Sequence, residues 1–185
     1  RLDVGALRRQ IIADRGAGDL PFLVVGTAGS VSTGAIDPLH AIAEIAREFD
    51  LWFHVDGAYG APAAVLPDAP DDLKALRLAH SVAIDPHKWL YAPLEAGCVL
   101  VREMRWLRDT FSYHPPYYPE VDYSPDAPVM YHEFGPQNSR GFRALKVWMG
   151  IRQVGRAGYA RMISEDIRLA RALYDLAASH PELEA

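Results

Sequence analysis

Short apolar runs alternate with helical patterns through the first hundred residues, and this order constrains the fold more than any other feature. Such alternation is typical of strands that lie parallel and are covered by helices. The predicted strands are short and apolar, and they span residues 22–25, 51–55, 81–84 and 97–102. The sequence therefore predicts an α/β fold with a mostly parallel sheet.

Length and charge limit the classes of function. A chain of 185 residues that is 50% hydrophobic can bury a core of its own, which excludes a disordered tail. Its formal net charge is −5 without any basic block, so nucleic acid is a poor partner and a small-molecule site is favoured. No apolar stretch approaches the roughly 18 residues of a membrane span. We therefore expect neither a nucleic-acid nor a membrane partner.

Cys98 is the single cysteine and cannot close an intrachain disulfide. Its apolar neighbours predict a buried strand residue, with a reactive thiol as the alternative. This cysteine usage fits a reducing cytoplasm, which we expect to be the location.

Polar residues gather where the predicted strands stop, and an open α/β sheet places its ligands there. The first strand leads into residues 27–34, a loop of glycines and hydroxyls that contains Ser30, Ser32 and Thr33. Asp37 is then predicted to cap a helix whose first turn carries Pro38. Short hydroxyls before a helix can bind a ligand or serve only as local caps.

Lys88 lies just past the third predicted strand, in Asp85-Pro86-His87-Lys88-Trp89. A lysine hemmed in by such neighbours has a lowered pKa, so its free amine can condense with an aldehyde. Pyridoxal phosphate is the obvious aldehyde. Taken alone, the segment is equally compatible with an ordinary turn.

Asp56 ends the second predicted strand, in His54-Val55-Asp56-Gly57-Ala58-Tyr59-Gly60. An acid at the end of a buried strand is poorly solvated and needs a cationic partner, which a protonated pyridine nitrogen would supply. Such a carboxylate makes the ring a stronger electron sink. A helix cap is the alternative for Asp56 alone, whereas its pairing with Lys88 favours the cofactor.

These segments resemble the group II pyridoxal-phosphate-dependent decarboxylases, which include aromatic L-amino acid, histidine and glutamate decarboxylases. The resemblance rests on GSVSTGAIDP, HVDGAYG, DPHKW and SRGFRALKVW, which occur in the family's order and near its spacings from about residue 20 to the end. It implies a fold-type I transferase-like architecture with pyridoxal 5'-phosphate as cofactor and no metal. Gly57 departs from the family pattern, which has alanine there.

The resemblance implies roles for individual residues. Lys88 would form the Schiff base with the cofactor, Asp56 would pair with the pyridine nitrogen, and Ala58 would pack on one ring face. His87 would position the cofactor and the departing carboxylate, unless it is only a turn residue. The hydroxyls of Ser30, Ser32 and Thr33 would bind the cofactor's ring oxygen or phosphate. Asp85 stands where some members carry asparagine, so we expect it to be structural.

Residues 111–137 contain six prolines and seven aromatic residues with little periodicity, which predicts a long loop rather than plain disorder. Residues 111–117, FSYHPPY, resemble the family's mobile catalytic loop. Tyr117 fits the tyrosine that protonates Cα after carbon dioxide leaves, although a slip of one residue would put Tyr118 there. Phenylalanine at that place accompanies oxidative deamination, so tyrosine favours simple decarboxylation. The alternative is an aromatic residue that packs a Pro-rich loop.

We therefore expect three regions: residues 1–110 as the second half of a cofactor-binding large domain, 111–137 as the catalytic loop, and 138–185 as a helical connection into a small C-terminal domain. Two helices are predicted there, over residues 143–154 and 159–178. In the family about half the chain precedes such a segment, so we expect an upstream N-terminal half, on a partner polypeptide or in a longer chain. The resemblance also implies a homodimer with the site at its interface.

The expected reaction is decarboxylation of an L-amino acid. The aromatic loop and Ser139 favour an aromatic substrate, because in plant members that position is linked to phenolic rather than indolic preference. An aldehyde synthase, which couples decarboxylation to oxidative deamination, is the nearest alternative. A desulfurase or aminotransferase of the same fold and a non-catalytic half-chain that docks a partner are the others.

Overall fold

The computed structural model describes residues 1–117, 124 and 127–184. The chain forms two compact units. The first consists of Arg1–Leu100 together with Arg143–Ala185, and the second is Val101–Phe142. The predicted boundaries at residues 110 and 137 remain predictions, because compact units are not the same as the expected functional regions.

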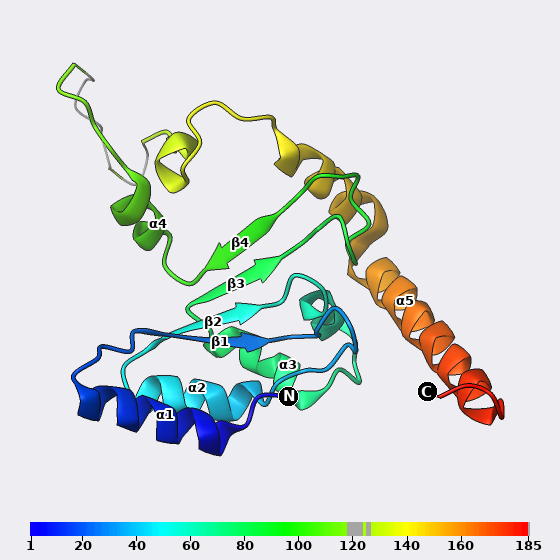
Figure 1. Cartoon of the computed structure of the whole chain (residues 1–185). Coiled ribbons are helices and arrows are strands. Elements are labelled where there is room, and N and C mark those ends of the chain that lie inside the picture. Colours follow the sequence, from blue (N-terminus) through cyan, green and yellow to red (C-terminus); the bar gives the residue numbers. More distant parts are fainter. Residues whose placement is uncertain (118–123, 125–126, 185) are drawn as a thin grey trace. The chain divides into compact units, whose positions relative to one another are not determined.

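The first unit is built on a four-stranded sheet whose strand order, β1-β2-β3-β4, follows the chain (Figure 1). The strands are β1 (Leu23–Thr27), β2 (Trp52–Asp56), β3 (Ser81–Ile84) and β4 (Cys98–Val101). β1, β2 and β3 are parallel, whereas the arrow of β4 points the opposite way in Figure 1. The predicted α/β fold with a mostly parallel sheet is confirmed, with strand ends shifted by a residue or two.

Helices cover one face of the sheet: α1 (Val4–Ala17), α2 (Leu39–Glu48) and the short α3 (Asp71–Lys74). Two 3-10 turns, η1 (Ala61–Val65) and η2 (Ala75–Leu78), complete the connections. Val24, Phe53 and Val55 alternate along the strands toward this face and are buried against Leu39 and Ile42 of α2. Buried apolar surface of this kind stabilises by roughly 25 cal/mol per Å².

The opposite face carries partly exposed side chains. Leu23 and Val25 of β1 are each 43% exposed, and Trp52 and His54 of β2 face the same side. Cys98 lies in β4 as predicted, but the expectation that it is buried is wrong. The first three residues of β4 are exposed, because no described element covers that strand.

Asp37 does not cap α2, contrary to the sequence-based expectation. The helix begins after Pro38 without a side-chain cap. The Asp37 carboxylate instead accepts the backbone N–H of Leu2 at 2.7 Å and that of Thr27 at 3.0 Å. It therefore holds the N-terminus against the end of β1.

The C-terminal part forms α5 (Arg143–Ser179), which is broken at Gly155. This glycine has φ 67° and ψ 168°, a conformation that L side chains rarely adopt. The break separates the two helices that the sequence predicts there, and both are confirmed. None of the described helices is long and apolar enough to cross a membrane.

The second unit contains α4 (Met104–Phe111) and the 3-10 turn η3 (Tyr131–Phe134). The predicted long loop therefore begins at the C-terminus of α4 and contains η3. Tyr118 lies outside the described residues. Glu133 of η3 is buried, which is unusual for a carboxylate.

Candidate active site

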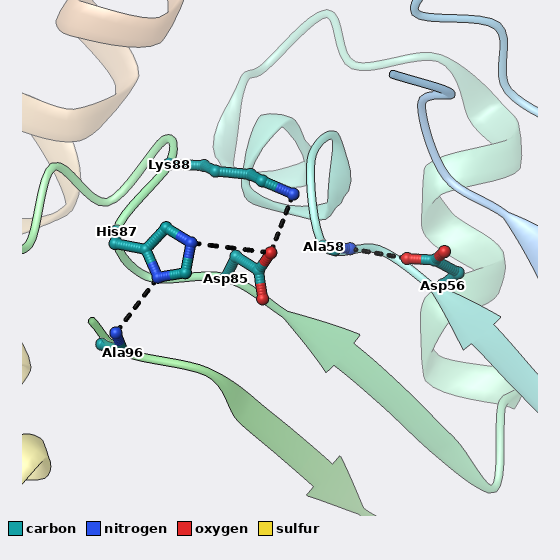
Figure 2. A network of polar contacts seen from close by, with 6 residues as sticks. All are labelled: Asp56, Ala58, Asp85, His87, Lys88 and Ala96. Carbon is teal, nitrogen blue, oxygen red and sulfur yellow. Dashed lines mark hydrogen bonds and ion pairs between the residues drawn. The ribbon is translucent and has the colours of Figure 1, made fainter. Parts of the chain in front are cut away.

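Lys88 lies in the turn after β3, and its side chain folds back over that turn (Figure 2). The turn is closed by the backbone N–H of Lys88, which donates to the carbonyl of Asp85 at 2.9 Å. The Lys88 amine lies 2.8 Å from Oδ2 of Asp85. The lysine side chain is 36% exposed, so its amine is held by a counter-ion yet open to a small molecule.

His87 is fixed by the chain that returns toward β4. Its Nδ1 accepts the backbone N–H of Ala96 at 3.1 Å. A ring nitrogen that accepts a hydrogen bond carries no proton, so the neutral imidazole has its proton on Nε2. That nitrogen lies 3.8 Å from Oδ2 of Asp85. Asp85 therefore orients the Lys88 amine and lies near His87, a positioning role that the sequence does not reveal.

Asp56 is the last residue of β2, beside Ala83 of β3 in the sheet register. Its Oδ1 accepts the backbone N–H of Ala58 at 3.1 Å, and its Oδ2 has no hydrogen-bond partner among the described residues. The Ala58 carbonyl in turn accepts the backbone N–H of Asp85 at 3.2 Å. The two acidic segments thus meet at one edge of the sheet. Asp56 is exposed, not poorly solvated as expected, because the chain leaves that side of β2 uncovered.

The loop after β1 lies directly against the loop after β2. The Gly60 N–H donates to the carbonyl of Ala28 at 2.9 Å, and a Cβ built on Gly60 would lie 2.4 Å from that oxygen. A Cβ on Gly29, which has φ +86°, would lie 2.9 Å from Cα of Gly60. Only glycine permits this approach of two backbones.

The predicted hydroxyl residues lie in this first loop. Oγ of Ser30 and Oγ1 of Thr33 are hydrogen-bonded to each other at 2.8 Å, and Thr33 also accepts the Ala35 N–H at 3.4 Å. Ser32 is exposed. Two of the three hydroxyls therefore shape their own turn.

A second network holds the segment after Lys88 against α5. Asp166 accepts the Trp89 indole N–H at 3.0 Å and the Tyr91 hydroxyl. Tyr159 donates to the carbonyl of Leu90 at 3.2 Å. Desolvation, together with the Asp166 carboxylate, raises the pKa of Tyr91 to about 12. Sequence reasoning missed Asp166, since it lies 77 residues from Trp89 and no local pattern marks it.

His54 is held on the uncovered face of β2, two residues before Asp56. The Trp52 indole N–H donates to Oγ of Ser81 at 2.8 Å, and that oxygen lies 2.7 Å from Nδ1 of His54. Because an indole only donates, the serine hydroxyl is free to donate to His54. The chain thus keeps the strand that ends in Asp56 tied to β3.

Tyr117 and Ser139 belong to the second unit, Val101–Phe142. Tyr117 is 81% exposed, and Ser139 is also exposed. The residues brought together by the first unit are Lys88, His87, Asp85, Asp56 and Ala58.

An amine, a carboxylate with one uncommitted oxygen and a small residue follow the carboxyl ends of adjacent parallel strands, which is where an open α/β sheet binds its ligands. The comparisons agree. The conserved domain of pyridoxal-dependent decarboxylases matches residues 1–184, and the chain belongs to this family. The expected fold type and the expected cofactor, pyridoxal phosphate, are thereby confirmed.

Relatives of known name are similar to this chain over nearly all of its length. An aromatic-L-amino-acid decarboxylase of Bacillus atrophaeus is 39% identical over 92% of the chain and 35% of the relative. The solved structure of Oryza sativa TDC with PLP and tryptamine has a TM-score of 0.88 at 31% identity, covering 96% of this chain and 36% of that one. For Rhodiola rosea 4-hydroxyphenylacetaldehyde synthase the TM-score is 0.83 at 32% identity, over 97% and 36%. The chain thus spans little more than a third of the length of these proteins.

The residues of the first unit fit pyridoxal phosphate chemically. Lys88 provides a reachable amine for the cofactor aldehyde, and the uncommitted Oδ2 of Asp56 can accept the proton of a pyridinium. The closely approaching Gly29 and Gly60 keep the neighbouring loop free of side-chain bulk. Asp85 is negative like the cofactor phosphate, and its carboxylate faces the Lys88 amine.

Proposed function

We propose that this chain provides the lysine and aspartate part of the active site of a pyridoxal-phosphate-dependent enzyme that decarboxylates an L-amino acid to its amine. The observation that supports the proposal is that Asp56 and Asp85, the carboxylate paired with Lys88, lie at the ends of adjacent parallel strands, and that the Asp85 N–H donates to the Ala58 carbonyl. The names of the relatives support an aromatic substrate. The chain spans little more than a third of those relatives, and a homodimer is the proposed assembly of the whole enzyme.

The bound cofactor supplies an electron sink for the electron pair that remains when carbon dioxide leaves. Lys88 would hold the cofactor aldehyde through its amine, and Asp85 would keep that amine oriented in the free state. Asp56 would hold the pyridine nitrogen in its protonated form, with Ala58 against the ring. His87 would orient the departing carboxylate through Nε2.

Tyr117 would deliver a proton from its hydroxyl to Cα, which completes the amine. The hydroxyls of Ser30, Ser32 and Thr33 would bind the cofactor's ring oxygen or phosphate. Ser30 and Thr33 would then give up the hydrogen bond that joins them. Ser139 would contribute to the choice among aromatic substrates. The regions 1–110, 111–137 and 138–185 would act as cofactor domain, catalytic loop and small-domain connection. We propose the cytoplasm as the location, since one cysteine suits reducing conditions.

Reductive trapping tests the cofactor assignment. The protein is incubated with pyridoxal phosphate, reduced with borohydride and analysed by peptide mass spectrometry. The chain has three lysines, so Lys74 and Lys146 serve as internal controls. We expect the phosphopyridoxyl adduct on Lys88 alone, and Lys88→Arg should abolish it. Equal labelling of all three lysines in folded protein would refute the site.

Product analysis tests the reaction. L-phenylalanine, L-tyrosine and L-tryptophan are supplied separately, and carbon dioxide, amine, aldehyde, ammonia and hydrogen peroxide are measured. Carbon dioxide with equimolar amine supports the decarboxylase. Aldehyde with ammonia and peroxide would identify an aldehyde synthase instead, and labelling of Lys88 in the whole enzyme without carbon dioxide from any amino acid would refute both.

A further inference from the structure

Glu133 carries a buried carboxylate for which the proposed chemistry gives no role. The residue is 3% exposed. Removing a charge from water costs several kcal/mol unless donors surround it. Two donors are present: Nε2 of His114 lies 2.6 Å from Oε1 of Glu133, and the Ser112 hydroxyl donates to the same oxygen at 3.3 Å. Glu133 is therefore a fixed acceptor for two side chains from a distant part of the chain.

Both donors, Ser112 and His114, shortly precede Tyr117 in the sequence. Ser112 ends α4, where its backbone N–H donates to the carbonyl of Arg108 at 2.8 Å. His114 follows two residues later, and only Pro115 and Pro116 separate it from Tyr117. Each proline fixes its own φ and restricts the residue before it. A fixed His114 therefore limits the positions that Tyr117 can reach.

The 3-10 turn η3, which carries Glu133, is also held at its C-terminal side. Arg140 donates to the carbonyl of Tyr131 at 3.0 Å and to that of Gln137 at 3.3 Å. These bonds secure η3 from its C-terminal side. Glu133 is thus anchored independently of His114, and the His114–Glu133 bond joins the two ends of residues 115–132.

We infer that Glu133 and His114 are positioning residues that hold Tyr117 where it protonates the substrate carbon, and so decide which product forms. This inference rests on the proposed function. When Tyr117 donates its proton to Cα, the product is the amine. When the proton arrives late, dioxygen takes two electrons and becomes hydrogen peroxide. The resulting C=N bond is then hydrolysed. That route consumes one dioxygen and one water and yields aldehyde, ammonia, carbon dioxide and peroxide.

The test compares Glu133→Ala, His114→Ala, the double variant and Glu133→Gln in the full chain. Glu165→Ala is the matched control, since this exposed carboxylate pairs with Arg168 on α5. The substrate is whichever of L-phenylalanine, L-tyrosine and L-tryptophan the unmodified protein decarboxylates fastest. Carbon dioxide, amine and peroxide are measured together, with Lys88 labelling as the check on the cofactor site.

We expect kcat for amine formation to fall about tenfold in either alanine variant, a part of the 10²–10⁴-fold that a general acid contributes. KM should stay within about twofold, and the peroxide formed per carbon dioxide should rise at least about fivefold. The double variant should lose no more than Glu133→Ala alone, because that single variant already removes the His114–Glu133 bond. Glu133→Gln retains an acceptor oxygen and should recover most of kcat, and Glu165→Ala should resemble the unmodified protein.

Unchanged product ratio and kcat in both alanine variants would overturn the inference. A fall in kcat without added peroxide would overturn it as well, since it would mean a structural role only. If Glu133→Ala fails to fold, the ratio of peroxide to carbon dioxide is compared in Ser112→Ala and His114→Ala. Glu133→Gln is then the variant that retains an acceptor oxygen. If the whole enzyme with unmodified residues releases no carbon dioxide, the proposed function itself is refuted, and this outcome differs from every outcome that concerns Glu133 and His114.

Discussion

Gly57 separates Asp56 from Ala58 and lies where the family pattern has alanine, so its replacement by alanine tests the packing beneath the site. A Cβ at this position would lie 2.4 Å from Cβ of Ala61 and 3.0 Å from the carbonyl oxygen of Ala83. Both distances are shorter than ordinary contacts. Ala61 therefore occupies the space that an alanine at position 57 would need.

Overpacking of this kind costs typically about 1–3 kcal/mol. For a chain of this size each kcal/mol lowers Tm by roughly 2–4 °C, so Gly57→Ala should lower Tm by roughly 2–12 °C. Thermal and denaturant unfolding followed by circular dichroism measure the loss. Because relief of the clash would move residues 56–58, the rate of Lys88 labelling by pyridoxal phosphate should fall as well.

Two further variants make the reasoning refutable. Gly16→Ala in α1 meets open space, and there alanine should stabilise by about 0.5–1 kcal/mol. Gly57→Ala combined with Ala61→Gly removes the closest contact, that with Cβ of Ala61, and should recover part of the lost stability. If Gly57→Ala alone unfolds at the original temperature and labels Lys88 at the original rate, the packing argument is wrong.

Three other predictions concern the site and its support. Asp56→Asn should lower kcat/KM for decarboxylation about 10- to 1,000-fold, tenfold per pKa unit lost at the pyridine nitrogen, while Lys88 still forms its adduct. Asp166→Ala leaves the donors of Trp89 and Tyr91 without their acceptor, so denaturant unfolding should show a loss of about 1–3 kcal/mol. Tyr91 has a folded-state pKa of about 12, above its ordinary value of 10.0, so the stability it adds is complete below pH 10 and falls as pH rises toward 12. The difference in unfolding free energy between the unmodified protein and Tyr91→Phe should therefore shrink between about pH 10 and pH 12.

Each of these outcomes has a clear contrary. Full activity in Asp56→Asn would show that the Asp56 carboxylate does not pair with the pyridine nitrogen. Unchanged stability in Asp166→Ala would show that water replaces its contacts without cost. A stability difference for Tyr91→Phe that grows with pH would contradict a raised pKa of Tyr91 in the folded protein.

Local patterns were sufficient for much of the fold. The four strands and both helical parts of α5 follow from periodicity and from short apolar runs, which are properties of neighbouring residues. The helix α1 was missed because only Ile11 is buried on it, so its apolar pattern is weak. Its ends nevertheless carry local signals, since Asp3 caps the N-terminus and Gly18 the C-terminus.

The site was predictable as a set of residues but not as a network. Lys88 and Asp56 stand in recognisable segments, and the proximity of these two segments follows from the adjacent parallel strands that precede them. The roles of Asp166 and Glu133 depend on contacts between distant segments, which no local pattern encodes. Asp37 shows the opposite error: an acid before a helix is a reasonable cap, but here a tertiary contact with Leu2 and Thr27 takes its place.

The strand order β1-β2-β3-β4 also has a consequence for how the chain acquires its structure. Each strand pairs with the one synthesised just before it, so every pairing closes only the connection between consecutive strands. Short closures of this kind cost less chain entropy than distant pairings and favour rapid folding. The sheet can therefore grow strand by strand as the ribosome delivers it, and the turn that carries Lys88 forms on an edge that β1 and β2 have already built.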